Sequence, residues 1–166
     1  PATTLDLTRW RMASRSIFGQ LSVDTDDPDA FEVELRTATA GDVSLFDMRT
    51  SPHTVARRAE HIDAADVPYC KLSLQIQGTS TMRQDGRECT LEPGDLALYV
   101  TQRPYELEYT HDQHSLVVHF PQSYLHLTPF QLEAITARTV SRDQGLGRGM
   151  VPLFEQLAEN IDVLEG

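Results

Sequence analysis

The stretch from Tyr69 to Phe120 constrains what this chain can fold into more than any other part of it. It divides into six short segments with the composition or alternation of β-strands, each bounded by turn residues. The predicted strands are Tyr69–Gln77, Thr79–Gln84, Arg87–Leu91, Leu96–Val100, Tyr105–Tyr109 and His114–Phe120. A meander of short strands this dense indicates a small barrel or a jelly roll.

The first of these strands shows the alternation most clearly. Apolar Cys70, Leu72, Leu74 and Ile76 alternate with polar Lys71, Ser73, Gln75 and Gln77. A two-residue period is typical of a half-buried strand, with its apolar face in the core and its polar face in solvent.

Two turns in this stretch have residue types that fix the backbone geometry. Asp85-Gly86 suits a type I′ hairpin, which needs positive φ at both central positions. In Glu92-Pro93-Gly94-Asp95, the proline presets φ for a type II turn and the glycine supplies the positive φ that follows. Both turns support the predicted strand boundaries on either side.

The residues before Tyr69 add three strands and an N-terminal arm. The predicted strands are Phe31–Thr39, Val43–Arg49 and Thr54–Ile62, which brings the total to about nine, enough to close a double-sheet barrel. Leu5–Phe18 mixes apolar and arginine residues and predicts a short helix or arm that lays one apolar side on the body.

After Phe120 the pattern becomes helical. Gln122–Leu127 predicts a helical turn, and Thr128 begins a helix as N-cap, with Pro129 at its first position and Gln131 closing a capping box. That helix is expected to end near Arg138. A glycine-rich segment, 145–149, then leads into a last helix whose apolar residues include Leu153, Phe154, Leu157 and Ile161. This stripe fits its own domain or, since the barrel is already closed, a partner's helix.

Charge and composition limit the possible partners. The net charge is −11, from 14 Lys and Arg against 25 Asp and Glu, so the chain is not expected to grip nucleic acid by itself. Lys71 is the only lysine, which we interpret as a genomic bias toward arginine codons. No stretch approaches a membrane span. Cys70 and Cys89 form no CxxC pair, which predicts reduced thiols and a cytoplasmic location.

No pattern in the chain predicts catalysis or a metal. Six histidines are present without a His-X-His pair, and nothing supports the one combination considered, His53 with His61 and His119. There is no GxSxG motif, and Glu106 and Glu108 share the solvent face of one strand. The prediction is a protein that is not an enzyme, with no catalytic residue, no metal and no cofactor.

The interior of the barrel is the remaining candidate for a site. Tyr105, Leu107 and Tyr109 line it from one strand. On the last strand either Leu116, Val118 and Phe120 or Ser115, Val117 and His119 face inward, and periodicity does not choose between them. A cavity with aromatic walls and a few polar groups is typical of a small-molecule site, and a filled barrel is the alternative.

Several segments together resemble the effector-binding domain of AraC-type transcriptional regulators. They are Lys71–Gln75 with Gly78, Gln84–Glu88, Leu91–Tyr99, Arg103-Pro104-Tyr105, Ser51-Pro52-His53 and Phe120-Pro121. The match extends from Trp10 to the end of the chain. A Pro-Gly-Asp turn alone is shared by all cupins, so the combined set carries the resemblance.

The resemblance implies a fold that is mainly β with C-terminal helices: a cupin-like double-stranded β-helix, or jelly-roll barrel, followed by two helices. It implies a metal-free barrel with an N-terminal arm over residues 1–127 and a helical dimerisation and linker segment over 128–166. The homodimer would form through the helix that contains Leu153, Phe154, Leu157 and Ile161. A helix-turn-helix domain is absent from this chain, so DNA contact is expected only through a separate C-terminal domain.

The resemblance also implies a small-molecule effector inside the barrel. Carried over by the matching strands, the inward groups are Tyr105, Leu107, Ser115, Val117 and His119, with Trp10 on the covering arm and Arg49 as a partner for an acid. The predicted function is ligand sensing and dimerisation for an AraC-type regulator. The alternative is a small cupin enzyme, an isomerase or oxygenase, with or without a metal.

Overall fold

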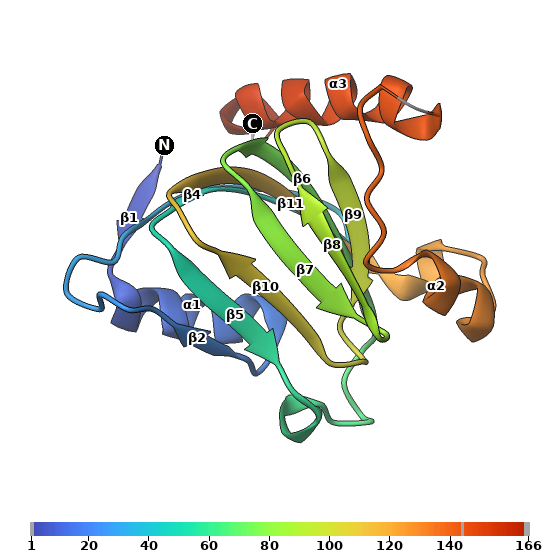
Figure 1. Ribbon diagram of the computed structural model, residues 1–166, viewed down its shortest axis with the longest axis horizontal. Helices are drawn as coiled ribbons and strands as arrows, with labels where there is room; N and C mark the ends of the chain where they lie inside the picture. The colour runs from blue at the N-terminus through green and yellow to red at the C-terminus, as the bar shows by residue number, and fades with distance from the viewer. Residues whose placement is uncertain (1, 144, 165–166) are drawn as a thin grey trace.

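The computed structural model describes residues 2–143 and 145–164 of the 166-residue chain. Within them, eleven strands form two antiparallel sheets that face one another (Figure 1). The first sheet has the order β1 (Thr3–Leu5), β3 (Val33–Ala40), β4 (Val43–Thr50), β11 (Gln113–Pro121), β6 (Tyr69–Gln77), β9 (Leu96–Val100). The second has the order β2 (Ser22–Asp24), β5 (His53–Arg57), β10 (Tyr105–Tyr109), β7 (Ser80–Gln84), β8 (Arg87–Leu91). The expected cupin-like barrel is confirmed.

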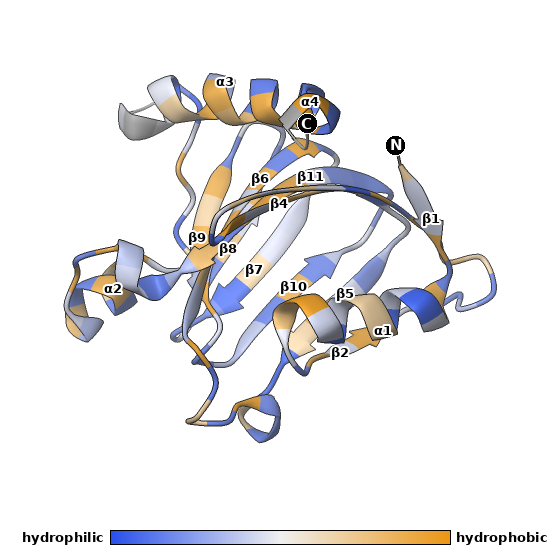
Figure 2. Cartoon of the chain, turned by 180° about the vertical axis from the view of Figure 1, so that it is seen from behind, coloured by the Kyte–Doolittle hydropathy of each residue, from blue (hydrophilic) through white to orange (hydrophobic). Residues whose placement is uncertain are grey.

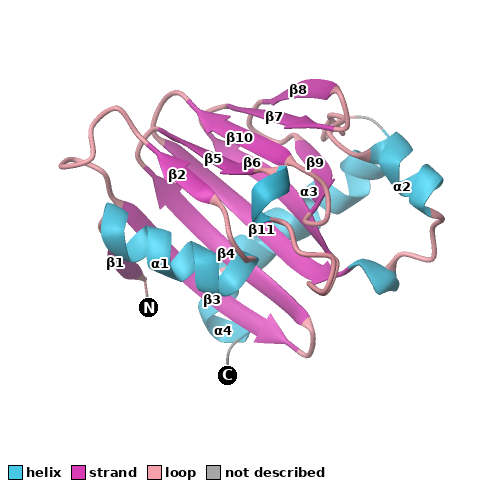
Figure 3. Cartoon of the chain, turned by 90° about the horizontal axis from the view of Figure 1, so that it is seen from below, coloured by secondary structure: helices cyan, strands magenta, loops and turns pink. Residues whose placement is uncertain are grey.

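Helices cover the barrel on three sides (Figures 1 and 3). They are α1 (Leu7–Phe18), α2 (Pro129–Ile135), α3 (Gly145–Glu159) and α4 (Ile161–Leu164), with 3₁₀ turns η1 (Ala59–His61) and η2 (Gln122–Tyr124). The described helices are too short or too polar to cross a membrane.

The strand boundaries agree closely with the sequence in the central stretch. Four of the six predicted strands have the observed bounds, and the other two differ by one residue at an end or at both. Both predicted turns have the required geometry, with φ of 56° at Asp85, 75° at Gly86 and 93° at Gly94. The capping box of α2 is also present, since Thr128 and Gln131 exchange side-chain and backbone hydrogen bonds.

Two predictions at the ends of elements are wrong, and two short strands were not predicted. The strand predicted over Thr54–Ile62 ends at Arg57, because the buried Arg57 guanidinium bonds the Gln20 and Thr101 carbonyls and the chain then turns into η1. The helix α2 ends at Ile135 rather than near Arg138, since residues 136–140 run beside β9 in two isolated β-bridges. The three-residue strands β1 and β2 are too short to show a period.

The strand β6 is buried on both faces, which corrects the expectation that its polar face meets solvent. Lys71, Ser73 and Gln75 are at most 2% exposed and point into the barrel. The apolar residues of β6 point outward instead, where Leu74 packs against the buried Val151 and Ala158 of α3. Figure 2 shows α3 lying across the outside of this sheet. A second layer of helix therefore supplies the cover that solvent was expected to provide.

The four residues predicted as dimer contacts lie at different depths in the structure. Ile161 is fully buried within the chain, and Phe154 and Leu157 are partly buried against the outer face of the first sheet. Leu153 is 56% exposed. The apolar stripe therefore mainly packs on its own domain, and dimerisation stays a prediction.

The helix α1 closes one side of the barrel (Figure 3). Asp6 caps it by accepting a hydrogen bond from the Arg9 amide at 2.9 Å. Its buried face includes Trp10 and Phe18, which pack against Phe46 and other residues on the inner side of the first sheet. The predicted N-terminal segment with one apolar side is thus a helix that covers the interior.

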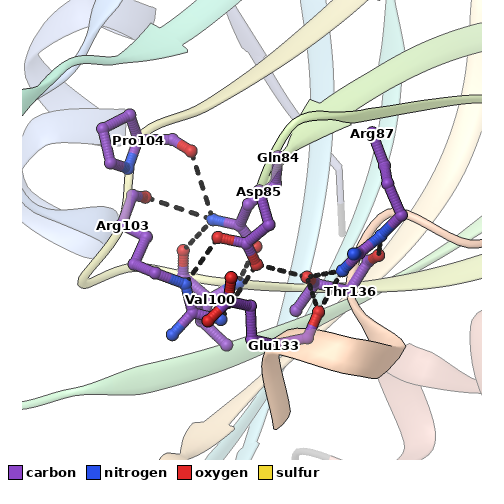
Figure 4. Close-up of polar contacts among 8 residues, drawn as sticks. All are labelled: Gln84, Asp85, Arg87, Val100, Arg103, Pro104, Glu133 and Thr136. Atoms are coloured by element: carbon purple, nitrogen blue, oxygen red, sulfur yellow. Dashed lines mark hydrogen bonds and ion pairs between the residues drawn. The ribbon is translucent and has the colours of Figure 1, made fainter. Parts of the chain in front are cut away.

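A polar network holds α2 to the rim of the barrel (Figure 4). The Asp85 carboxylate accepts hydrogen bonds from Arg103, at 2.7 and 3.0 Å, and from the Thr136 hydroxyl. Arg87 donates to the Thr136 carbonyl at 2.9 Å and to the Glu133 carbonyl. The Asp-Gly turn therefore closes a hairpin and also fixes the end of α2.

Candidate ligand site inside the barrel

The candidate site is the space between the two sheets under α1. Its walls are largely aromatic, formed by Trp10, Phe18, His53, Tyr99, Tyr105 and Tyr109. The cavity left between these side chains is about 30 Å³. That volume holds a water molecule, whereas a cavity that binds benzene is about 150 Å³. An organic ligand can enter only if part of the lining moves.

Lys71 is the central polar group of this interior. Its side chain is 2% exposed, and its Nζ donates a hydrogen bond of 2.7 Å to the Tyr105 hydroxyl oxygen. The same Nζ lies 3.9 Å from the centre of the Phe18 ring of α1, a cation–π distance. Burial, and secondarily the charge of Arg57, lowers the pKa of Lys71 well below its ordinary value.

No carboxylate balances Lys71 inside the barrel. Among the described residues that line the cavity there is no Asp or Glu. The nearby Arg57 is 2% exposed, and its acidic partner Asp66 is 46% exposed. No described acidic side chain of the cavity lining therefore favours the charged form of Lys71.

The other titratable side chains of the interior are uncharged at neutral pH. Burial raises the pKa of Tyr99 and of Tyr105 well above the ordinary value and that of Tyr109 to about 12. Burial lowers the pKa of His53 to about 4, and burial together with the charge of Lys71 lowers that of His119 to about 4. The tyrosines are thus hydroxyl donors and the histidines neutral rings.

A set of paired amides forms the rigid part of the wall. Gln75 Nε2 donates to Gln113 Oε1 at 3.0 Å, and Gln113 Nε2 donates to the Thr50 hydroxyl at 2.8 Å. The Ser80 hydroxyl donates to Gln75 Oε1 at 2.9 Å. Because these groups already bond one another, they shape the wall of the cavity but leave few donors or acceptors free for a ligand.

Two other buried polar atoms of the interior have no hydrogen-bond partner in the part of the chain that the structure describes. They are Trp10 Nε1 and Ser73 Oγ. The Ser115 hydroxyl interacts with Tyr109. Buried polar groups are normally paired, and an orphaned group calls for an explanation such as a ligand or water. Tryptophan can only donate and a hydroxyl can donate, so these atoms suit a ligand that accepts hydrogen bonds.

The structure brings together six of the seven predicted site residues on the inner side of the barrel. Trp10, Tyr105, Leu107 and Val117 line the cavity. Ser115 and His119 share the inner face of β11, which decides the register that periodicity left open. Their contact with a ligand stays a prediction.

Arg49 is the exception. Its side chain is exposed on the outer face of β4, beside Glu34 of β3, in an open groove outside the barrel. The inner face of this strand carries Met48 and Thr50 instead. The structure therefore does not bring Arg49 to the interior site.

Sequence reasoning missed Lys71, which occupies the interior position expected of a charged partner. One signal was available in the sequence. The only lysine among 14 Lys and Arg residues stands in a strand in which polar and apolar residues alternate. A solvent-facing polar side was the simpler interpretation of that strand. It is wrong because α3 covers the apolar side.

Metal ligands do not converge in the described residues. Residues 2–143 and 145–164 contain no group of three or more His, Cys, Asp or Glu side chains placed to hold a metal ion. The histidines considered from sequence, His53, His61 and His119, form no such group.

Comparison with known proteins places this chain in a family. Residues 10–166 match the family model of the AraC-binding-like domain, which is nearly the whole chain. The chain belongs to this family. The resemblance drawn from the turn and strand motifs is thereby confirmed.

Two curated relatives are longer proteins. One, 31% identical over 116 residues, is described as an uncharacterized protein in the nit 5′ region of Bacillus sp. (strain OxB-1); the match covers 70% of this chain and 45% of the relative. The other, 28% identical over 162 residues, is the transcriptional activator NphR of Rhodococcus sp.; the match covers 93% of this chain and 48% of NphR. The chain spans about half the length of these relatives.

A solved structure shares the fold. The AraC-like transcriptional activator CuxR superposes with a TM-score of 0.80 over 98% of this chain and 62% of the CuxR chain, at 20% identity. Membership of the AraC-binding-like family supports the sensing domain of a regulator, and the likeness to CuxR shows the fold.

Proposed function

We propose that this domain senses a small-molecule effector inside its barrel and passes that signal on as part of an AraC-type transcriptional regulator. The observation that carries the proposal is the interior itself: a closed, aromatic space that contains a buried lysine amine without an acidic partner in the described lining, and two unpartnered polar atoms, Trp10 Nε1 and Ser73 Oγ. Such an interior is costly unless it has a binding role. Membership of the AraC-binding-like family supports the same role.

Entry of the effector requires α1 to move. Trp10 and Phe18 belong to both the cavity wall and the α1 core contacts, and the closed cavity has room for little more than a water molecule. A ligand that binds only when α1 is displaced shifts the domain toward that second state by its difference in affinity. The displaced helix is then the signal.

Homodimerisation and control of a DNA-binding domain outside this chain complete the proposal. The outer surface of α3 offers Leu153 to a second copy, while its inner surface stays on the barrel. The domain carries out no catalysis in this scheme.

A thermal-shift screen of the chain against aromatic acids, sugars and small amines tests the proposal. A ligand present at a hundred times its Kd stabilises the fold by about 2.7 kcal/mol. Leu107→Phe, whose extra volume is close to that of the cavity, fills the interior and should abolish that shift while the variant stays folded. Glu108→Gln, one residue further along β10 on the solvent side, is the matched control and should keep it. A ligand whose shift survives Leu107→Phe would place binding outside the barrel.

A further inference from the structure

The proposed effector site contains more hydrogen-bond donors than acceptors. Lys71 has two N–H donors when neutral and three when protonated, and only one is used, toward Tyr105. Tyr105 accepts that bond with its oxygen, so its own O–H proton remains free to donate. Trp10 Nε1 and the Ser73 hydroxyl have no partner among the described residues.

The shape of the interior places these donors at one end and aromatic rings around them. The Lys71 amine lies near the rings of Phe18, Tyr99 and Tyr105, at 3.9, 5.5 and 4.9 Å from their centres. A cationic ligand would find no carboxylate there, because the described lining contains no Asp or Glu. A sugar would need many paired donors and acceptors, but the amides of Gln75 and Gln113 are already bonded to their neighbours.

We propose that the effector is a small aromatic carboxylic acid, whose carboxylate accepts hydrogen bonds from Lys71 Nζ and the Tyr105 hydroxyl inside the barrel. This inference rests on the proposed sensing function and names the ligand class of that site. The aromatic ring of the acid takes the space that Phe18 and its neighbours on α1 now occupy. The carboxylate supplies the negative charge that the described cavity lining lacks. It favours the protonated form of Lys71 and forms an ion pair with it.

The open groove along the rim outside β5 and β10 does not compete for such a ligand. It measures about 610 Å³, and its lining includes Asp24, Asp26, Asp27, Glu108 and Asp112. These carboxylates repel an acid.

A second outer groove, also of about 610 Å³, contains arginines beside carboxylates: Arg58, Arg83, Arg87 and Arg103 with Asp85, Glu88 and Glu106. The Arg58→Met variant described below distinguishes binding in that groove from binding inside the barrel, under α1.

Proton uptake is a further consequence. The free domain keeps Lys71 in a place that disfavours its charge, and the bound carboxylate restores that charge. Binding of the acid anion then takes up a proton, and the affinity rises as the pH falls toward neutrality from the alkaline side.

Isothermal titration calorimetry with benzoate, phenylacetate and 4-hydroxybenzoate, each paired with its neutral primary amide, tests the inference. At least one acid should bind the 166-residue chain more than tenfold more tightly than its amide. Repeating the titration in buffers of different ionisation enthalpy should show up to one proton taken up per acid bound.

Two variants assign the effect to the named residues. Lys71→Met should weaken binding of the acid about 10- to 100-fold and abolish proton uptake, with the affinity for the amide unchanged. Tyr105→Phe, which removes only one oxygen, should weaken binding of the acid about tenfold. Arg58→Met removes an exposed cation of the same region and should change neither affinity. Circular dichroism checks that each variant is folded.

The possible outcomes separate the inference from the proposed function. Equal binding of acid and amide, or an acid affinity that is unchanged in Lys71→Met, overturns the inference and leaves the sensing function in place. The same holds when none of the three acids binds but a sugar or an amine does. When no class of small molecule binds, the sensing function itself falls and the inference falls with it.

Discussion

Lys71 lowers the stability of the unliganded domain, because the fold buries an amine beside aromatic rings and gives it no acid. Its pKa is lowered in the folded state, whereas in the unfolded chain it is near 10.4. Below that unfolded value the unfolded chain binds more protons than the folded one, so this residue makes stability rise with pH up to about 10.4.

Lys71→Met should therefore stabilise the free domain at neutral pH, by on the order of 1 kcal/mol. The gain should shrink as the pH approaches the unfolded pKa of Lys71. Urea unfolding at several pH values measures it, with Arg58→Met as the control for loss of a surface cation. A Lys71→Met variant that is less stable than the parent at pH 7 would show that the buried amine has a favourable partner.

Arg49 gives a second prediction for a single residue. Because its side chain is exposed on the outer face of β4, Arg49→Met should leave the affinity for an aromatic acid within about twofold of the parent. Calorimetry with the acids named above measures it. A loss as large as that of Lys71→Met would put the acid beside Arg49 in the outer groove.

The sequence predicted some residues of the barrel interior correctly, but it missed Lys71 and wrongly included Arg49. Alternation on β10 identified Tyr105 and Leu107 as inward residues without a structure. Alternation cannot say which side of a strand faces the barrel when both sides are buried. The residue types of β6 then favour the wrong side, since lysine is seldom buried.

At the scale of elements, α1 is the part that must move for a ligand to enter. It contains Trp10, the only tryptophan, which is 3% exposed in the closed state. A saturating aromatic acid should shift Trp10 emission to longer wavelength and make α1 more accessible to protease. Binding seen by calorimetry with unchanged Trp10 emission would show that the ligand enters without displacing α1.

The helices α2 and α3 both expose apolar residues, which allows the dimer interface to be assigned. Leu153 on α3 is 56% exposed and Phe130 on α2 is 82% exposed. If α3 forms the dimer, Leu153→Asp should convert it to a monomer, and Phe130→Asp should not. Size-exclusion chromatography with light scattering distinguishes the two. The opposite result would assign the interface to α2.

At the scale of the whole molecule, the net charge of −11 predicts how the chain behaves toward DNA. The 166-residue chain alone should give no mobility shift with duplex DNA at about 50 mM salt, where phosphate contacts are strongest, since its net negative charge opposes those contacts. A salt-sensitive shift by this chain would contradict the proposal that DNA contact belongs to a separate domain.

Most of the architecture could be read from the sequence, and the reasons are local. Turns such as Glu92-Pro93-Gly94-Asp95 and the capping box at Thr128 specify their geometry within four residues. The site depended on a longer-range fact, namely that α3 covers the outside of β6 and so turns Lys71 inward. No pattern within β6 contains that information.

The packing of α3 against β6 limits the positions at which this domain can be fused to another protein. A fragment cut at residue 127 or 143 loses the cover over Leu74 and Leu116, and its bare sheet would drive aggregation. A reporter grafted after residue 164 keeps that cover. The strand β6 carries Lys71 on its inner side, toward the proposed ligand, and Leu74 on its outer side, against α3. A reporter fused after α4 would therefore be linked to the proposed ligand site through α3 and β6.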